Sequence, residues 1–383
     1  MTDPMPRTMT HHTPGVSYED QAREAAKYAE DKMQALFAKG RADLPGFLDA
    51  LDHEAAGRED SVLAARGLRF DVGENDEVRM HFGNDDVARD YGLHDHAVGQ
   101  LMTRGAINVP SRFGRDLAQG PRWQRDLLAH NLNEIYERSD GKVLVRAVHG
   151  KAKGVLSDRY AIMDTRPLMA AFAEETTKLG AVPIMTHRME VRNAIKVMLP
   201  RIFSPVGFER IALGLMFRNS DYGSGALDIR VFALRLWCTN FATMESELRK
   251  VHLGSRMIEG IALSHETHGK VQDALMSAIR DIVSQTLNED ALEAMMGRIT
   301  ASHEKELGST ESVVNLLRGQ FGVKKAKEIA EVFNGGDVPV EALPPGRTQY
   351  RLSQAVGWWA QNQEKQEDRL DAEMAAGKLL AVA

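Results

Sequence analysis

Short runs of alternating apolar and polar residues fill the middle of the chain, between Lys142 and Val231. Alternation with a period of two indicates β-strands that bury one face. The predicted strands lie on both sides of 149–154 (HGKAKG), and in 187–200, 209–219 and 226–231. Residues 220–225 (SDYGSG) supply the glycines that a tight turn needs for positive φ angles. The middle of the chain is therefore expected to be built from antiparallel hairpins.

Helical spacing of apolar residues appears on both sides of this part. It begins at Tyr18, continues with breaks at Gly and Pro to about Asp140, and returns beyond about Gly260. The run FALRLWCTNFATM (232–244) fits either a strand or a helix, and the spacing of Phe232 and Leu236 favours a helix.

The expected fold is α+β, with a central antiparallel β-hairpin sheet flanked by N-terminal and C-terminal helical regions. The predicted divisions are a flexible tail (1–17), a mainly helical region (18–140), a basic β-rich core domain (141–262) and a C-terminal helical region (263–383). The loop 335–346 is expected to precede the last helix.

A single cysteine, Cys238, excludes an internal disulfide framework and a multi-cysteine zinc site, and it fits a reducing cytoplasm. The N-terminal segment has no apolar stretch behind a basic start, so a secretory signal is not expected. Because no run approaches about 18 apolar residues, no membrane helix is expected. We therefore predict a cytoplasmic protein.

Charge is distributed unevenly along the chain. The net charge is −6, yet residues 142–256 hold 18 Lys and Arg against 10 Asp and Glu. A basic segment inside an acidic chain predicts a local anionic partner, and single-stranded DNA is the favoured one.

The basic residues of the predicted hairpins are candidates for contact with a nucleic-acid backbone. Lys151 and Lys153 are placed in the first turn. Arg188, Arg192 and Lys196 recur every four residues, so one extended strand would point all three to the same side. Phe217, Tyr222 and Phe232 are the neighbouring aromatics for base stacking. The full candidate set is Arg146, Lys151, Lys153, Arg159, Arg188, Arg192, Lys196, Arg218, Tyr222, Arg230 and Arg235. The alternative is that these residues form ordinary solvated strand faces.

A second candidate is a helix-turn-helix in 84–107. Ala88, Gly92 and Val98 have the spacing that lets two helices cross closely. Several aspartates there oppose the approach of a duplex, so a plain helical hairpin is the favoured interpretation.

Signals for catalysis are weak. His265 and His268 do not have the spacing of the H-E-x-x-H zinc motif, and the chain contains no G-x-x-x-x-G-K-[ST] phosphate loop. Cys238 follows Trp237 in an apolar setting that is typical of a buried, inert thiol. No catalytic residue, cofactor or metal is therefore predicted, and whether the protein is an enzyme stays open, with a non-enzyme favoured.

Several stretches together resemble the phage/plasmid-like family called domain of unknown function 932. They are GKAKGVLSDRY (150–160), residues 212–240, HLGSRMIEGI (252–261) and TQYRLSQAVGWWA (348–360). The similarity spans roughly Val87 to Trp359. Phe241 stands where the family usually has a glycine.

The resemblance implies a role in DNA metabolism on phages and mobile elements, such as recombination or evasion of host defence. The arrangement is also similar in outline to phage single-strand annealing proteins, although the long helical C-terminus departs from them. We therefore expect sequence-independent binding or annealing of single-stranded DNA. The alternative is a regulatory or anti-defence protein that acts on a host protein or through 84–107. A homo-oligomer also stays open.

Overall fold

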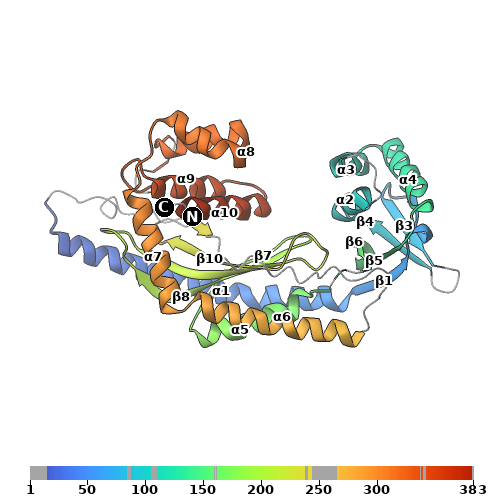
Figure 1. The fold of residues 1–383 in the computed structure, drawn as a ribbon, viewed down its shortest axis with the longest axis horizontal. Coiled ribbons are helices and arrows are strands. Elements are labelled where there is room, and N and C mark those ends of the chain that lie inside the picture. Colours follow the sequence, from blue (N-terminus) through green and yellow to red (C-terminus); the bar gives the residue numbers. More distant parts are fainter. Residues whose placement is uncertain are drawn as a thin grey trace.

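The computed structural model describes residues 15–83, 88–104, 110–158, 160, 162–237, 240–243, 265–336, 338–339 and 342–381. Within these ranges the chain forms two β-sheets with helices packed on them (Figure 1). The α+β class and the helices at both ends of the chain are confirmed. The prediction of one central sheet is wrong, because the strands divide between a six-stranded and a five-stranded sheet.

The six-stranded sheet combines strands from two parts of the chain. Its spatial order is β1-β5-β6-β4-β3-β2, and neighbouring strands are antiparallel except β4 and β6, which run parallel. The strands are β1 (Arg58–Ala64), β2 (Arg69–Val72), β3 (Val78–Phe82), β4 (Arg89–Leu93), β5 (Lys142–Val148) and β6 (Lys151–Ser157). The predicted first hairpin is confirmed as β5 and β6. It belongs to this sheet, together with strands that precede residue 141.

The prediction that helix continues to about Asp140 is wrong for residues 58–93. β1 begins with three charged residues, and Val62 within it is 58% exposed. β1 and β2 lie at the two edges of the sheet, where few side chains reach the core. Such strands contain few apolar residues, so their period-two signal is weak.

Three helices pack on the six-stranded sheet. They are α2 (Asp95–Arg104), α3 (Ser111–Gln119) and α4 (Arg122–Glu137). Leu101, Leu128 and Leu132 are fully buried and share one core with Phe70 and Val145 of the strands. The helix-turn-helix and the favoured plain helical hairpin in 84–107 are both wrong, because the described part of this segment is strand β4 followed by the single helix α2.

The five-stranded sheet is antiparallel throughout, in the order β11-β10-β9-β8-β7. Its strands are β7 (Val182–Arg188), β8 (Asn193–Phe203), β9 (Ile211–Asn219), β10 (Asp228–Arg235) and β11 (Asn240–Thr243). The strands predicted in 209–219 and 226–231 are confirmed. The single strand predicted in 187–200 is wrong, because these residues end β7, turn, and begin β8. The helix favoured for 232–244 is also wrong, because β10 continues to Arg235 and β11 follows.

Helices cover both faces of the five-stranded sheet (Figure 1). They are α1 (Tyr18–Ala56), α5 (Thr165–Lys178), α6 (His265–Thr286), α7 (Glu289–Glu304), α8 (Thr310–Phe333), α9 (Gln349–Gln361) and α10 (Gln366–Ala381). On one face Phe217 packs against Phe172 of α5, with ring centroids 5.3 Å apart. On the other face Phe232 shares a core with Phe37 of α1. Burial on both faces explains why residues 211–217 are apolar without a break.

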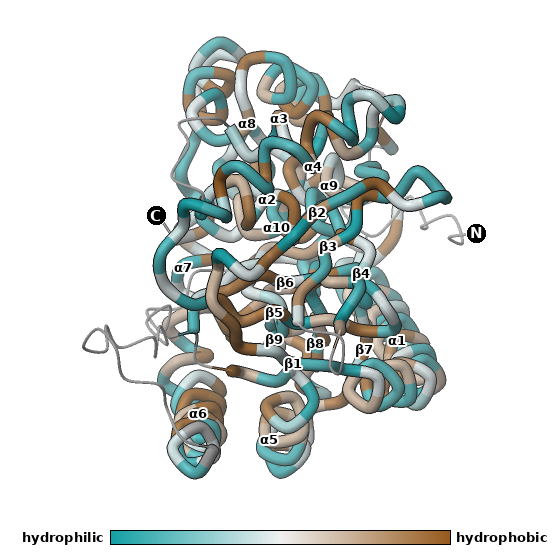
Figure 2. Tube along the Cα trace, turned by 90° about the vertical axis from the view of Figure 1, so that its right-hand side faces the viewer, coloured by the Kyte–Doolittle hydropathy of each residue, from teal (hydrophilic) through white to brown (hydrophobic). Residues whose placement is uncertain are grey.

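The hydropathy of the trace follows the same division, since hydrophobic stretches gather on the inner strands β5, β8 and β9 (Figure 2). Among the described residues, no helix is both long and apolar enough to cross a membrane.

Candidate functional site

The turn predicted at 220–225 joins β9 to β10, and Gly223 and Gly225 have φ angles of 73° and 114°. The first half of this turn is buried: Asp221 and Tyr222 are 4% and 1% exposed. The carboxylate of Asp221 accepts a hydrogen bond of 2.6 Å from the backbone N–H of Thr165 and pairs with Arg58. The turn therefore fastens the five-stranded sheet to the six-stranded sheet.

Arg146 is the most buried cation at this junction, with 1% of the residue exposed. Its guanidinium donates to both carboxylate oxygens of Asp60, at 2.9 and 3.0 Å, and to Asp164 at 2.8 Å. The guanidinium also donates a hydrogen bond to the backbone carbonyl of Asp221, at 2.7 Å. Burial acts to lower the pKa of Arg146, but the bonds and charges of the two aspartates outweigh it and raise the pKa.

Glu54, near the end of α1, gathers a second set of predicted residues. The hydroxyl of Tyr222 donates to its carboxylate at 2.6 Å, and Lys153 and Arg188 lie 3.2 and 3.0 Å from its oxygens. Burial alone would raise the pKa of Glu54, but these partners lower it. Lys153 also lies 5.3 Å from the centroid of the Tyr222 ring. The tyrosine is thus committed to internal contacts and offers no open face for a base.

Strand placement separates the three cations that the sequence puts on one face. Arg188 ends β7, Arg192 lies in the turn before β8, and Lys196 lies within β8. Lys196 is fully buried and donates to Glu373 of α10 at 2.6 Å. Burial lowers the pKa of Lys196 despite this partner. The prediction of one exposed basic strand face is therefore wrong.

The remaining predicted cations also meet carboxylates. Arg230 pairs with Asp228 at 2.6 Å, and Arg235 pairs with Glu209 at 2.8 Å. The other pairs are Arg218 with Asp228 and Asp371, Arg192 with Glu367, and Lys151 with Glu77. Lys151 and Lys153 lie in β6 and not in the turn, whose tip is 149–150. The stacking aromatics Phe217 and Phe232 are completely buried.

All nine predicted cations among the described residues thus have an acidic partner within the chain. Arg159 and Cys238 lie outside the described residues. Phe241, which replaces the glycine expected from the family resemblance, is buried with its ring centroid 3.7 Å from the Lys196 ammonium. The basic segment of the sequence therefore serves mainly to hold the two sheets and their helices together.

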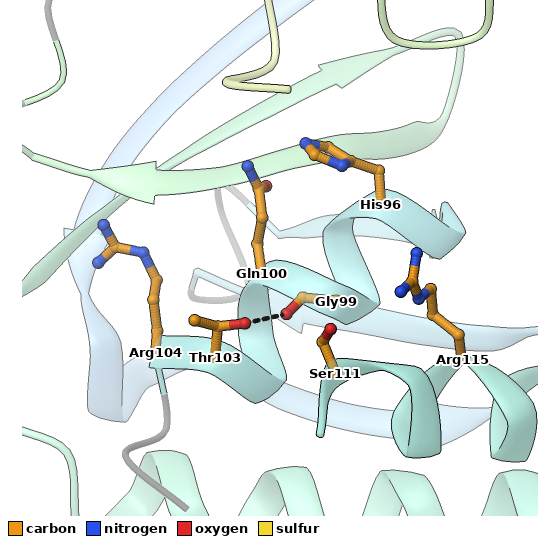
Figure 3. A pocket seen from close by; sticks show the side chains of 7 residues that line it. All are labelled: His96, Gly99, Gln100, Thr103, Arg104, Ser111 and Arg115. Carbon is orange, nitrogen blue, oxygen red and sulfur yellow. Dashed lines mark hydrogen bonds between the residues drawn. The ribbon is translucent and has the colours of Figure 1, made fainter. Parts of the chain in front are cut away.

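A different group of polar residues surrounds a pocket of about 290 Å³ between α2 and α3. We call it the arginine pocket, and it is lined by His96, Gly99, Gln100, Thr103, Arg104, Ser111 and Arg115. Arg104 and Arg115 stand at opposite ends, with the hydroxyl residues between them (Figure 3).

One glycine allows the two helices of this pocket to approach closely. A Cβ added to Gly114 of α3 would lie 2.4 Å from a side-chain carbon of Met102 in α2, so a larger residue would force the methionine to move. At Gly99 of α2 a Cβ would lie 3.9 Å from Cδ and Nε of Arg115, which is an ordinary contact. The close packing of the helices therefore depends on Gly114.

The two arginines of the pocket differ from the cations at the junction. Both are exposed, and neither has a carboxylate within ion-pairing distance among the residues that the structure describes. Partial burial lowers the pKa of Arg104, and interactions with Tyr136 and Asp158 offset this only in part. An arginine without an acid partner keeps its five N–H donors available for another anion.

Neighbouring groups hold the wall of the pocket in place. Gln100 donates to the backbone carbonyl of Tyr222 at 2.9 Å and accepts from the backbone N–H of Val155 at 2.7 Å. His96 lies 3.1 Å from the same carbonyl, and burial lowers its pKa. These contacts fix α2 against the 220–225 turn, so the pocket is rigidly connected to the junction.

Two aromatic side chains are exposed on the helices next to the pocket. Phe113 of α3 is 45% exposed and Trp123 of α4 is 63% exposed. Arg112, beside Phe113, is an exposed residue whose nearest acid is Asp116 at 3.7 Å. Exposed aromatic faces on the helices around a basic pocket are a combination that suits single-stranded nucleic acid.

Sequence reasoning missed Arg115 and gave Arg104 no place among the backbone contacts. The segment 110–123 (PSRFGRDLAQGPRW) holds three arginines and two large aromatics with a single aspartate. That signal was available, but it lies outside the basic window 142–256.

The chemistry of the pocket is binding chemistry. Guanidinium, hydroxyl and amide groups suit a phosphate or another oxyanion. Among the described residues, no group of three or more His, Cys, Asp or Glu is arranged to hold a metal ion.

No family model, curated protein or solved structure matches this chain. The resemblance to the phage/plasmid-like family therefore stays a prediction from short motifs.

Proposed function

We propose that the protein binds single-stranded nucleic acid, with backbone phosphates held in the arginine pocket. One observation carries the proposal: Arg104 and Arg115 face a common pocket and have no carboxylate partner among the described residues. Guanidinium groups without acid partners keep their N–H donors available, and phosphate oxygens are acceptors that match them.

The surroundings favour a polynucleotide over an isolated phosphate ion. Phe113 and Trp123 are exposed on α3 and α4, where they offer faces for base stacking. Stacking accepts every base, so binding is expected to be largely independent of sequence. The annealing role expected from the sequence is part of the same proposal, because a strand held by its backbone keeps its base edges open to a complement.

The test is binding of a labelled single strand of about 40 nucleotides and of its duplex, over a series of salt concentrations with magnesium present. The double variant Arg104→Gln/Arg115→Gln is expected to bind the single strand at least 10-fold more weakly. Loss of two phosphate contacts lowers the slope of log K against log salt by about 1.4.

The matched control is Lys27→Gln/Arg41→Gln, which removes two exposed cations of α1 and leaves the pocket intact. It is expected to bind like the wild-type protein. Equal affinity of the pocket variant and the control would reject the arginine pocket as the site. Failure of the wild-type protein to bind either DNA would reject the proposed function and direct the search to protein partners.

A further inference from the structure

Helix α8 carries a second group of cations without acid partners. Residues 316–327 (LLRGQFGVKKAK) contain four cations and no acidic residue. We call the group the α8 patch, and it consists of Arg318, Lys324, Lys325 and Lys327. All four residues are exposed, and none is paired with a carboxylate of the described part of the chain.

The backbone of α8 concentrates three of these charges. Gly322 has φ 74° and ψ 168°, which breaks the helix, so the lysines begin its second half. Cations in the first turn of a helix are unfavourable, because the helix dipole places positive charge there. Lys324 and Lys325, in this first turn, therefore gain no stabilisation from the helix dipole.

The patch also has apolar and aromatic neighbours. Leu316 and Val323 are 54% and 59% exposed on the same segment. Lys325 lies 5.6 Å from the ring centroid of Trp359 in α9, which fixes one cation over the body of the protein. A mixed basic and apolar surface fits a single strand, which presents both phosphates and bases.

Helix α8, which carries the patch, lies on the same side of the molecule as α3, which lines the arginine pocket. Figure 1 shows α8 above α9 and α10 at about the same height as α3, with the five-stranded sheet below α8. Figure 2, turned by 90°, again shows α8 and α3 close to the same vertical line. The helices that carry the two basic groups therefore lie on one side of the elongated molecule, one over each sheet.

We propose that the α8 patch is a second contact for the same single strand, which thus spans the helices of both sheets. This inference rests on the proposed function. A regular series of phosphates can reach both basic surfaces at once, and the two contacts then reinforce each other through a high effective concentration. A short oligonucleotide engages one surface at a time and gains nothing from the second.

The experiment compares single strands of about 8 and about 40 nucleotides, because about 4 to 16 nucleotides are the usual site size of one single-strand binding module and the longer strand exceeds it. The triple variant Lys324→Gln/Lys325→Gln/Lys327→Gln is expected to bind the longer strand about 10-fold more weakly, with its salt slope lowered by about 2. Binding of the shorter strand to the arginine pocket is expected to stay within 2-fold of the wild type.

The matched control is Lys27→Gln/Lys142→Gln/Lys365→Gln, which removes three exposed lysines elsewhere. Thermal unfolding of both variants verifies that the fold is retained. If the lysine variant binds both lengths like the control while Arg104→Gln/Arg115→Gln is impaired, the α8 contact is overturned and the proposed function stands. Equal weakening for both lengths would overturn a spanning strand, and no binding by the wild-type protein would overturn both proposals.

Discussion

Arg146 at the junction and Arg115 in the arginine pocket have the same side chain and opposite surroundings. Arg146 is 1% exposed and shares its donors among two aspartates and a carbonyl. Arg115 is exposed, with no carboxylate close by among the described residues. The difference shows that a buried cation with acid partners stabilises the fold, whereas an exposed cation without such partners is free to bind another anion.

The largest expected effect on the free energy of unfolding comes from removing Arg146, the buried cation at the junction. Arg146→Met leaves Asp60 without its buried counter-charge and Asp164 with Arg58 alone, which is expected to cost about 3 to 5 kcal/mol in free energy of unfolding. Arg115→Met removes an exposed charge and is expected to cost less than about 0.5 kcal/mol. Urea unfolding of both variants measures the contrast. Similar losses for the two would mean that the comparison does not hold.

A somewhat smaller effect is expected at the buried pair of Lys196 and Glu373. Lys196→Met strands a carboxylate in the interior and is expected to cost about 3 kcal/mol. The double variant Lys196→Met/Glu373→Leu removes both charges and is expected to recover most of that loss, since apolar replacements of a buried pair are often neutral. If the double variant is as unstable as the single one, the pair contributes more than mutual neutralisation.

The smallest expected effect concerns pH. His187 is 6% exposed, and burial together with Lys196, Arg369 and Lys39 lowers its pKa from 6.5 to about 3. Below pH 6.5 His187 binds a proton in the unfolded chain but stays neutral in the folded protein. The free energy of unfolding therefore falls as the pH decreases from 6.5 toward 3. The loss that His187 contributes is about 2 kcal/mol at pH 5.

The variant His187→Gln cannot bind this proton, so its stability is expected to fall less steeply between pH 7 and pH 5. Thermal or urea unfolding across that range provides the measurement. Parallel pH profiles for the variant and the wild-type protein would contradict the lowered pKa.

The strands of the five-stranded sheet were partly predictable because helices cover both of its faces. Residues 211–217 are buried without exception, and an unbroken apolar run next to a glycine turn is a strong signal. The six-stranded sheet was harder to predict. β1 pairs with β5 at sequence separations of 78 to 90 residues, and most of β1 is polar. Its place in the sheet depends on contacts that no local pattern records.

The prediction of an exposed basic site on the hairpins was wrong for a related reason. Charge density in the sequence identified basic residues correctly, but Arg146 and Asp60 lie 86 positions apart and Lys196 and Glu373 lie 177 apart. Neutralisation between such distant residues is invisible until the fold is known. Arg104 and Arg115 are distinguished by the absence of such partners, which is a property of the fold and not of the segment.

The hydrogen bond between Tyr222 and Glu54 has a consequence for folding during synthesis on the ribosome. The two residues are separated by 168 positions, so the ribosome makes Glu54 well before its hydroxyl partner. At about 5 to 20 residues per second, the delay is on the order of 10 to 30 seconds. During that time β1 and the end of α1 lack the contacts that the 220–225 turn makes with them in the folded protein. In a nascent chain stalled before residue 220, Glu54 is therefore expected to be accessible to proteases and chaperones. Once the 220–225 turn has left the ribosome, its contacts are expected to bury this carboxylate.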